Sequence, residues 1–233
     1  MSVTSKRKLV IIGAGGFGAV VAQLAEDLNA PTANHKSATP WHVIGYMDSD
    51  PAKRRTRHAG RTVHGTIEEV CREFREQELW FFCAIGDNRA RARMVRCAEE
   101  IGWKPATLVH PSAILDSTVT IGPGSYIGPA SVISFHSRIG AHVTVDMHVS
   151  IGHDAELLDF CEVFPGARIN GNCRLGAYSL VGSNATLLPG TVVGENAVVG
   201  ANSLAHGCVE PNVTIFGVPA RIIRRTKSSF SPQ

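Results

Sequence analysis

Aliphatic residues recur at every sixth position through the second half of the chain. The series begins at Val109 and continues without a failure to Val199. Four residues after most members stands a small residue, such as Ser125 or Ala197, and glycine often follows the aliphatic residue directly. A six-residue period of β-branched residues and glycines fits neither a helix nor a hairpin, but is typical of a parallel β-helix whose hexapeptides each form one flat face and its turn.

Three such faces make one coil, so residues 18 apart are expected to stack above one another in columns. The span from Val109 to about Ser203 supplies roughly five coils, with the aliphatic residues inside. The period does not fix the handedness of the prism, although right-handed crossovers are the usual rule for parallel strands.

The first hundred residues carry a different pattern. Lys8 to Leu28 reads as a buried strand, a glycine turn and an amphipathic helix, with Gly13, Gly15 and Gly18 in the G-x-G-x-x-G spacing. A glycine turn at a helix N-terminus presents unpaired N–H groups and the positive end of the helix dipole, which favours a phosphate.

Two further strand patterns follow in this region. A strand at His42–Met47 ends in Asp48-Ser49-Asp50, a helix is predicted near Thr66–Gln77, and a strand from Leu79 ends in a loop at Gly86–Asn88. This is a βαβαβ pattern. Only about 105 residues precede the repeat, which is enough for a mononucleotide-binding half but short for a complete dinucleotide fold. The pattern therefore favours a mononucleotide over NAD.

Composition narrows the class of protein. With 233 residues, 44% hydrophobic and 18% charged, the chain is composed like a soluble globular protein. A net charge of +3 gives no reason to expect a nucleic-acid or membrane partner. We expect neither a signal peptide nor a membrane-spanning segment, because the start passes directly into a strand and glycine pattern and no apolar run reaches spanning length. We expect a cytoplasmic protein. The basic runs at Lys53–Arg57 and Arg221–Lys227 are interpreted as solvated surface. The same interpretation applies mainly to the arginines of a predicted helix after Asn88, namely Arg89, Arg91, Arg93 and Arg96, with Arg89 also a candidate phosphate contact.

The six cysteines show no CxxC pair or zinc-ribbon spacing, so we expect free thiols.

Several motifs together resemble one family along nearly the whole chain. They are G-x-G-G-x-G at Gly13–Gly18, "GYMDSDP", "AIGDN", "LVHPSA", and the hexapeptide repeat closed by Ile215–Arg221. The family is the bacterial nucleotide-aminosugar N-acetyltransferases, with the related sialic-acid O-acetyltransferases of the hexapeptide-repeat class. The resemblance implies a Rossmann-like α/β domain over 1–108 and a left-handed parallel β-helix over 109–223. We expect residues 224–233 to form a disordered tail.

The resemblance also implies an activity and a site. It implies a homotrimer that transfers acetyl from acetyl-CoA to the amino group of a nucleotide sugar in surface-glycan biosynthesis, without a metal. His153 would be the catalytic base and Asp154 its partner. The residues implied to bind the nucleotide sugar are Gly13, Gly15, Gly16, Phe17, Asp48, Ser49, Gly86, Asn88 and Asp146. Those implied to bind acetyl-CoA are Glu162, Gly171, Ser183, Ala201 and Pro219.

The 18-residue spacing between stacked positions supports part of this site. Gly171 lies 18 residues after His153, where a backbone donor could receive an oxyanion, and Pro165, Ser183 and Ala201 form another column that suits a pantetheine arm.

The sequence departs from the family pattern at four places. Phe17 and Glu162 stand where relatives carry histidine, Asp146 stands where asparagine is common, and Pro31–Trp41 is an insertion before the second strand that could reshape the substrate pocket.

Four alternatives stay open at this stage. A covalent route would use Cys161 or Cys173, which occupy the small position of the repeat. A zinc-dependent γ-type carbonic anhydrase has histidines spaced like His148 and His153. A hydroxyl could replace the amine as acceptor. A β-helix of this regularity could also be a scaffold or sugar-binding module without activity.

Overall fold

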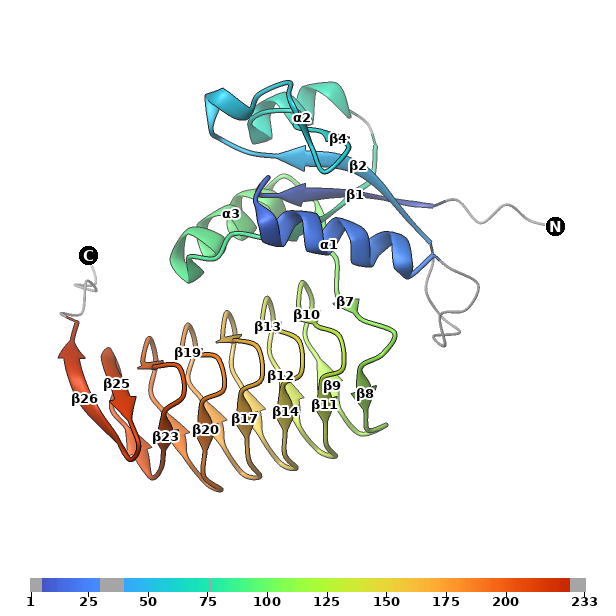
Figure 1. Cartoon of the computed structure of the whole chain (residues 1–233). Coiled ribbons are helices and arrows are strands. Elements are labelled where there is room, and N and C mark those ends of the chain that lie inside the picture. The colour runs from blue at the N-terminus through green and yellow to red at the C-terminus, as the bar shows by residue number, and fades with distance from the viewer. Residues whose placement is uncertain (1–5, 30–39, 76, 227–233) are drawn as a thin grey trace. The chain divides into compact units, whose positions relative to one another are not determined.

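The computed structural model describes residues 6–29, 40–75 and 77–226, and the chain divides into two compact units, 1–111 and 112–233 (Figure 1). Residues 31–39 of the predicted insertion lie outside the described residues, as does the end of the predicted tail from residue 227.

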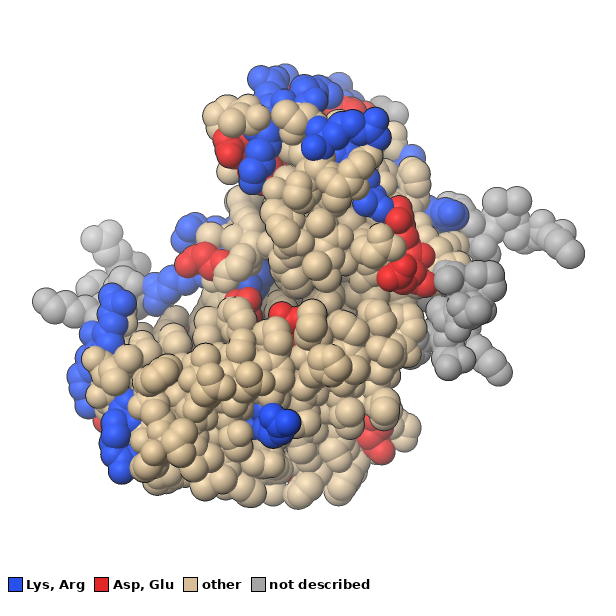
Figure 2. Space-filling model, viewed as in Figure 1, with Lys and Arg blue, Asp and Glu red and all other residues tan. Residues whose placement is uncertain are grey.

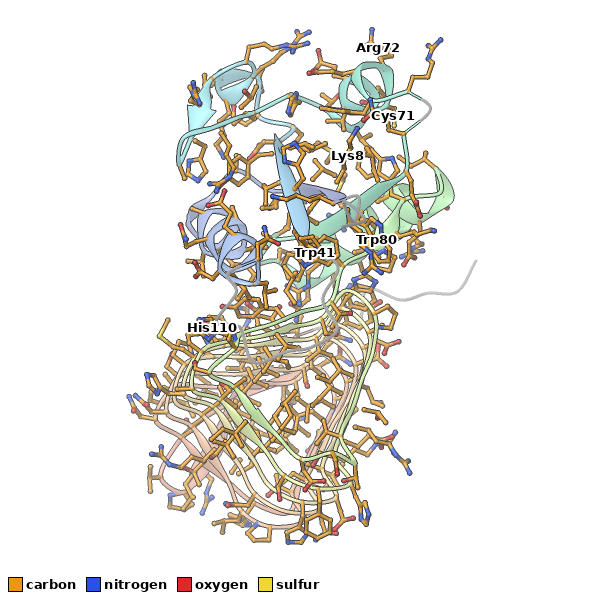
Figure 3. The ribbon with its side chains drawn as sticks, turned by 90° about the vertical axis from the view of Figure 1, so that its right-hand side faces the viewer. Lys8, Trp41, Cys71, Arg72, Trp80 and His110 are labelled. Atoms are coloured by element: carbon orange, nitrogen blue, oxygen red, sulfur yellow. The ribbon has the colours of Figure 1, made fainter. Side chains whose placement is uncertain are left out.

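The first unit is built on a parallel sheet. Its strands are β1 (Arg7–Ile12), β2 (Trp41–Met47), β5 (Leu79–Cys83) and β6 (Lys104–Pro105), in the order β2-β1-β5-β6. The remaining elements are α1 (Gly16–Asp27), η1 (Pro51–Lys53), β3 (Arg57–His58), β4 (Arg61–Thr62), α2 (Ile67–Glu73) and α3 (Asn88–Glu100). Helix α1 lies on one side of the sheet, and α2 and α3 lie on the other (Figure 3). Helices on both faces explain why Leu9–Ile12 of β1 are almost fully buried, and the predicted α/β class is confirmed.

The amino end of this sheet is closed by side chains. Trp41 and Trp80 pack edge to face with ring centroids 5.7 Å apart (Figure 3). The Asn29 side chain holds Trp41 through two hydrogen bonds, donating from Nδ2 to the Trp41 carbonyl at 2.8 Å and accepting from its N–H at 2.7 Å. Ligands of parallel sheets bind at the opposite, carboxyl edge, which is the edge that carries the glycine loop.

The second unit is a parallel β-helix with three sheets, and the first strand of this β-helix, β7 (Leu108–Val109), lies just before residue 112. The first sheet contains β7, β10 (Tyr126–Ile127), β13 (Thr144–Val145), β16 (Glu162–Val163), β19 (Leu180–Val181), β22 (Val198–Val199), β25 (Val213–Gly217) and β26 (Ala220–Arg225). The second contains β8 (Ile114–Leu115), β11 (Val132–Ile133), β14 (Ser150–Ile151), β17 (Arg168–Ile169), β20 (Thr186–Leu187) and β23 (Leu204–Ala205). The third contains β9 (Thr120–Ile121), β12 (Arg138–Ile139), β15 (Glu156–Leu157), β18 (Arg174–Leu175), β21 (Val192–Val193) and β24 (Cys208–Val209).

The predicted register holds residue by residue. Ile133 pairs with Ile151 and Ile151 with Ile169, so stacked residues are 18 apart, and the interior positions from Ile127 to Val199 are at most 3% exposed. The small residues are buried as well, and the Ser131 hydroxyl donates to the Asp146 carbonyl at 2.7 Å. The second and third sheets have six strands each, which makes about six coils instead of roughly five. The difference arises because the coil continues past Ser203 with a shortened turn, so that Val192 pairs with Cys208.

From Gly124 onward, the turns of the β-helix place one residue each in the left-handed region of the backbone map. Every sixth residue from Gly124 to Asn202 has a φ between 54° and 74°, and Asp154 is one of them. We call the turn from the first to the second sheet the first corner, the turn from the second to the third sheet the second corner, and the return to the first sheet the third corner. Glycine and asparagine tolerate this backbone most readily, and both recur in the series.

The C-terminal end differs from the predicted tail. Arg224 and Arg225 belong to β26, where Arg225 pairs with Val213 and its guanidinium binds the Glu210 carboxylate, so the prediction of disorder from residue 224 was wrong for these residues. Basic side chains gather at this end of the β-helix, whereas the rest of the β-helix face in view carries few charges (Figure 2). Among the described residues no helix has the length and apolarity to cross a lipid bilayer.

Candidate active site

His153 and Asp154 lie at the second corner, between β14 and β15. The Nδ1 atom of His153 is 2.8 Å from Oδ2 of Asp154, and both side chains are about half exposed. A carboxylate accepts from an N–H group, so this contact fixes the tautomer in which Nδ1 carries the proton and Nε2 carries the lone pair. The pair therefore presents a basic nitrogen at the surface of the β-helix.

The ring of His153 is held between two neighbouring coils. The ring of Phe135, one coil earlier, is stacked at a centroid distance of 5.5 Å and an angle of 16°. On the next coil, a Cβ added to Gly171 would lie 2.7 Å from Nε2 of His153. Only glycine leaves room for the imidazole in this orientation. The column arithmetic that placed Gly171 beside His153 is confirmed, and the Asn172 N–H donates to the His153 carbonyl at 2.9 Å.

A second imidazole contacts the same aspartate. Nδ1 of His136 is 3.5 Å from Oδ1 of Asp154. The hydrogen bond from His153 is the main reason that the pKa of Asp154 lies below its ordinary value, and His136 adds to the effect. Sequence reasoning missed Phe135 and His136, although they precede His153 and Asp154 by the same 18 residues that identified Gly171.

The backbone N–H of Gly171 is a further feature of this corner. Its carbonyl accepts from the Gly190 N–H at 2.9 Å, while its own N–H donates to no acceptor within residues 6–29, 40–75 and 77–226. An unpaired N–H beside an imidazole is the type of donor that receives a developing oxyanion.

The glycine residues predicted to cradle a phosphate lie at the carboxyl edge of the α/β sheet. Gly13 follows β1 with a φ of 107°, and its N–H donates to the Met47 carbonyl at 2.7 Å. Cβ atoms added to Gly15 or Gly16 would meet nothing within 4 Å, so the approach to the first turn of α1 is open. Phe17 is in that first turn, and its ring packs edge to face against Phe82 with ring centroids 6.1 Å apart.

Asp48 braces the glycine loop from the end of β2. Its Oδ2 accepts from the Ala14 N–H at 2.9 Å and pairs with Lys53 at 2.9 Å, and its Oδ1 accepts from the Asp50 N–H. Burial alone would raise the pKa of this carboxyl, but the hydrogen bonds from Asp50, Lys53 and Ala14 together hold it below its ordinary value. The predicted contact of Asp48 with a nucleoside stays a prediction, as does that of the neighbouring, exposed Ser49.

The loop after β5 is held by hydrogen bonds from the buried Arg91. Arg91 is only 3% exposed, and it donates to the Ile85 carbonyl at 2.9 Å and to Oδ1 of Asn88 at 2.7 Å. The interpretation of Arg91 as solvated surface was therefore wrong. The helical spacing of Arg91, Val95 and Ala98, which share the buried face of α3, is the signal that would have found it. Gly86 in the same loop is exposed.

Most other predicted residues lie away from the second corner. Asp146, Ser183 and Ala201 are at the first corner, where the Asn202 N–H donates to the Ser183 carbonyl at 2.8 Å and the predicted column is confirmed as geometry. Glu162 is on β16 of the first sheet, and Pro219 lies between β25 and β26. Within one chain none of these residues shares the second corner with His153.

The structure does not favour the covalent cysteine route or the zinc site. Cys161 is fully buried, its Sγ donates to the Gly176 carbonyl at 3.1 Å, and burial raises the pKa of its thiol to about 11. It is therefore a poor nucleophile. His148 is at the first corner and His153 at the second, and within the described part of the chain no three His, Cys, Asp or Glu side chains are grouped to hold a metal ion. All six cysteines are free thiols, as predicted.

Comparisons with known proteins match both units. Residues 8–97 match the PglD N-terminal domain, and residues 172–207 match the bacterial transferase hexapeptide repeat. An asparagine-for-histidine variant of perosamine N-acetyltransferase from Caulobacter crescentus, solved with CoA and GDP-perosamine, is 27% identical with a TM-score of 0.83, covering 95% of this chain and 99% of that chain.

Two further relatives extend the comparison. The acetyltransferase domain of PglB from Neisseria gonorrhoeae is 30% identical with a TM-score of 0.79, covering 94% of this chain and 100% of that domain. GDP-perosamine N-acetyltransferase from Escherichia coli O157:H7 is 27% identical over 156 residues, which are 65% of this chain and 71% of that protein. Other curated relatives match over short stretches, and there the chain spans about a quarter of their length.

The two units and these matches define a class, that of transferases with an N-terminal α/β domain joined to a left-handed β-helix. The chain belongs to the hexapeptide acyltransferase family.

Proposed function

We propose that this enzyme transfers the acetyl group of acetyl-CoA to the amino group of a nucleotide-linked amino sugar, with His153 as general base. The observation that carries the proposal is the half-exposed His153–Asp154 pair, with its Nε2 lone pair directed away from Asp154. The relatives with CoA, acetyl-CoA or GDP-perosamine in their structures, which match nearly the whole chain, support the choice of donor and acceptor.

The proposed chemistry is a direct transfer. The amine nitrogen attacks the thioester carbonyl carbon while Nε2 of His153 accepts the amine proton, and Asp154 stabilises the resulting imidazolium. The tetrahedral intermediate then collapses, the carbon–sulfur bond breaks, and the CoA thiolate leaves and takes up the proton. The unpaired N–H of Gly171 is our candidate for the donor to the oxyanion.

We propose that the complete site is shared between neighbouring copies of a homotrimer. His153 and Gly171 lie at the second corner, whereas Ser183, Ala201 and Asp146 lie at the first corner of the same chain. A groove lined by both sets therefore needs the second corner of one copy and the first corner of the next. Closed rings form by this kind of head-to-tail contact. In the same proposal Glu162 and Pro219 contact acetyl-CoA.

The α/β unit is proposed to hold the nucleotide of the acceptor. The open amides of Gly15 and Gly16 at the start of α1 suit its phosphates, and Phe17, Gly86 and Asn88 border the same edge of the sheet. Asp48 and Ser49 would approach the ribose or base. A cytoplasmic location, where acetyl-CoA and nucleotide sugars are made, is part of this proposal.

A panel experiment tests the function. Purified protein is incubated with acetyl-CoA and UDP-, GDP- or dTDP-linked amino sugars, and acetylated product is detected by mass spectrometry. We expect one nucleotide class to give product and NADH to show no binding by calorimetry. Absence of product across the panel, together with tight NADH binding, would contradict the proposal.

The acceptor atom needs a separate measurement. An amide product resists hydroxylamine, whereas an ester formed on a hydroxyl is cleaved by it. A hydroxylamine-labile product would replace N-acetylation with O-acetylation while leaving His153 in the same role, because a hydroxyl also loses a proton as it attacks.

A further inference from the structure

We propose that His136 is a positioning residue that tunes the proton affinity of His153 through Asp154, so that the site is a coupled histidine–aspartate–histidine unit. This inference rests on the proposed function of His153. It deepens that function by assigning a role to an imidazole that is outside the adjacent pair.

The geometry of the carboxylate carries the proposal. Asp154 uses its two oxygens for two different rings: Oδ2 contacts Nδ1 of His153 at 2.8 Å, and Oδ1 lies 3.5 Å from Nδ1 of His136. The two histidines come from consecutive coils of the second corner, so the rigid register of the β-helix keeps both within reach of one side chain.

Phe135 links the same groups by packing. Its ring is stacked on His153 at 5.5 Å and meets His136 edge to face at 4.8 Å. The backbone N–H of His136 donates to Oγ1 of Thr118 at 2.7 Å, which anchors the turn that carries the second imidazole. The His136 ring therefore contacts Phe135 and faces Asp154, its backbone is anchored by Thr118, and the ring itself stays largely exposed.

The other charged groups around the corner are few. Asp116, one coil earlier, attracts a protonated His136. Arg138 follows His136 on β12, Glu156 follows Asp154 on β15 and pairs with Arg174 at 3.0 Å, and Arg168 on β17 donates to the Gly166 carbonyl. Asp154 is thus the charged group that faces both imidazoles, and Asp116 is a further negative charge that acts on His136.

The sign of the coupling follows from charge. When His136 is protonated, it is a cation close to His153 and shares the negative charge of Asp154. Both effects disfavour a proton on His153 while His136 carries one, so the two rings compete for protons through Asp154. Removing the imidazole of His136 should therefore raise the midpoint of His153.

NMR titration of protein labelled with ¹³C at histidine Cε1 tests the coupling without any substrate. His153 and His136 resonances are assigned from their loss in His153→Asn and His136→Asn. Asparagine suits the left-handed backbone of position 136, since Asn172 occupies the same column. His42→Gln, which removes an exposed histidine of β2, is the control.

We expect the His153 midpoint to rise by about half a pH unit in His136→Asn, from the interaction of two partly solvated charges. Linkage requires the His136 midpoint to rise equally in His153→Asn. Asp154→Asn should lower both midpoints, and His42→Gln should change neither. An unchanged or lower His153 midpoint in His136→Asn would overturn the proposal, as would an Asp154→Asn variant in which only His153 responds.

The failure of this inference is distinguishable from that of the proposed function. In the active enzyme, the acid limb of kcat/KM should move to higher pH in His136→Asn while KM for acetyl-CoA stays constant. If the NMR midpoint moves and the rate profile does not, His153 is not the base. If neither moves, the bridge through Asp154 is absent.

Discussion

The carboxyl edge of the α/β sheet and the second corner of the β-helix place their polar groups in opposite ways. At the sheet edge the candidate side chains are engaged within the unit: Asp48 accepts from Ala14 and Asp50 and pairs with Lys53, and Asn88 accepts from Arg91. At the second corner, His153 and Asp154 contact each other and remain about half exposed. The first region thus shapes backbone amides for a ligand, whereas the second presents side chains for chemistry.

The difference teaches where substitutions should act. In the sheet-edge loops the ligand-facing surface is backbone, so a change of side chain affects the shape of the loop. At the corner, the ladder of the β-helix holds the backbone, so a side chain can change with little effect on the fold. The predictions below use this contrast.

The largest effect is expected from His153→Ala. Loss of a general base should lower kcat by on the order of 10²- to 10⁴-fold. The melting temperature should stay nearly constant, because the side chain is half exposed and the backbone hydrogen bond to Asn172 remains. Steady-state kinetics and thermal unfolding measure the two quantities, with His42→Ala as a control. A variant that acetylates its substrate at the normal rate would remove His153 from the mechanism.

The glycine loop offers a matched pair of substitutions. A Cβ at Gly18 would overlap the Gly13 carbonyl oxygen, whereas a Cβ at Gly15 meets nothing within 4 Å. Gly18→Ala should therefore destabilise the α/β unit by about 1–3 kcal/mol through overpacking. Gly15→Ala should leave stability within about 0.5 kcal/mol, and the bulkier Gly15→Val should weaken nucleotide-sugar binding without weakening acetyl-CoA binding. Chemical denaturation and calorimetry separate these effects, and equal stability of the two alanine variants would contradict the account.

Gly171→Ala should displace the imidazole of His153. The added Cβ would lie 2.7 Å from Nε2, so the ring must leave its slot against Phe135. A rotamer displaced by about 30° costs roughly 0.5–1.5 kcal/mol, which corresponds to up to about tenfold in kcat. An alanine variant with unchanged kcat would show that the slot does not matter for the reaction.

The smallest effect on activity is expected from Cys161→Ala, which should retain it. Because burial raises the pKa of Cys161 to about 11, its thiolate forms only as pH rises towards that value. Iodoacetamide at pH 8 should therefore label the exposed Cys97 and Cys208 and spare Cys161. Peptide mapping by mass spectrometry gives the result, and an acetylated Cys161 trapped during turnover would replace direct transfer with a two-step route.

The β-helix could be predicted from sequence almost residue by residue. Every interior residue must be aliphatic and every coil must stack in register, so the six-residue period in the sequence directly reflects the packing of the coil. The 18-residue spacing alone predicts that Gly171 lies beside His153. Phe135 and His136 obey the same count but carry no glycine or acid signal of their own. The shortened turn after Ala205 broke the period and hid the last coil.

The α/β unit was predictable only in outline. Strand and helix patterns predicted the order of its elements. The role of Arg91, however, depends on which face of α3 is covered. The role of Asp48 depends on its hydrogen bond with Ala14, in a loop 34 residues away in sequence. Side-chain partners brought together by loops leave no period to count. The corners that carry Gly171, Ser183 and Ala201 follow from the count, but the neighbouring copy proposed to complete the groove does not.

Subunit complementation tests the central claim that two copies share the site. His153→Ala removes the base at the second corner, and Ala201→Phe should block the acyl-donor groove at the first corner, so each variant alone should be inactive. In a randomly mixed trimer of equal amounts, three quarters of the trimers contain both subunits and each of these has one intact interface out of three. The account predicts recovery of about a quarter of wild-type activity after mixing and reassembly. A mixture that stays inactive, or an Ala201→Phe enzyme that is fully active, would contradict it.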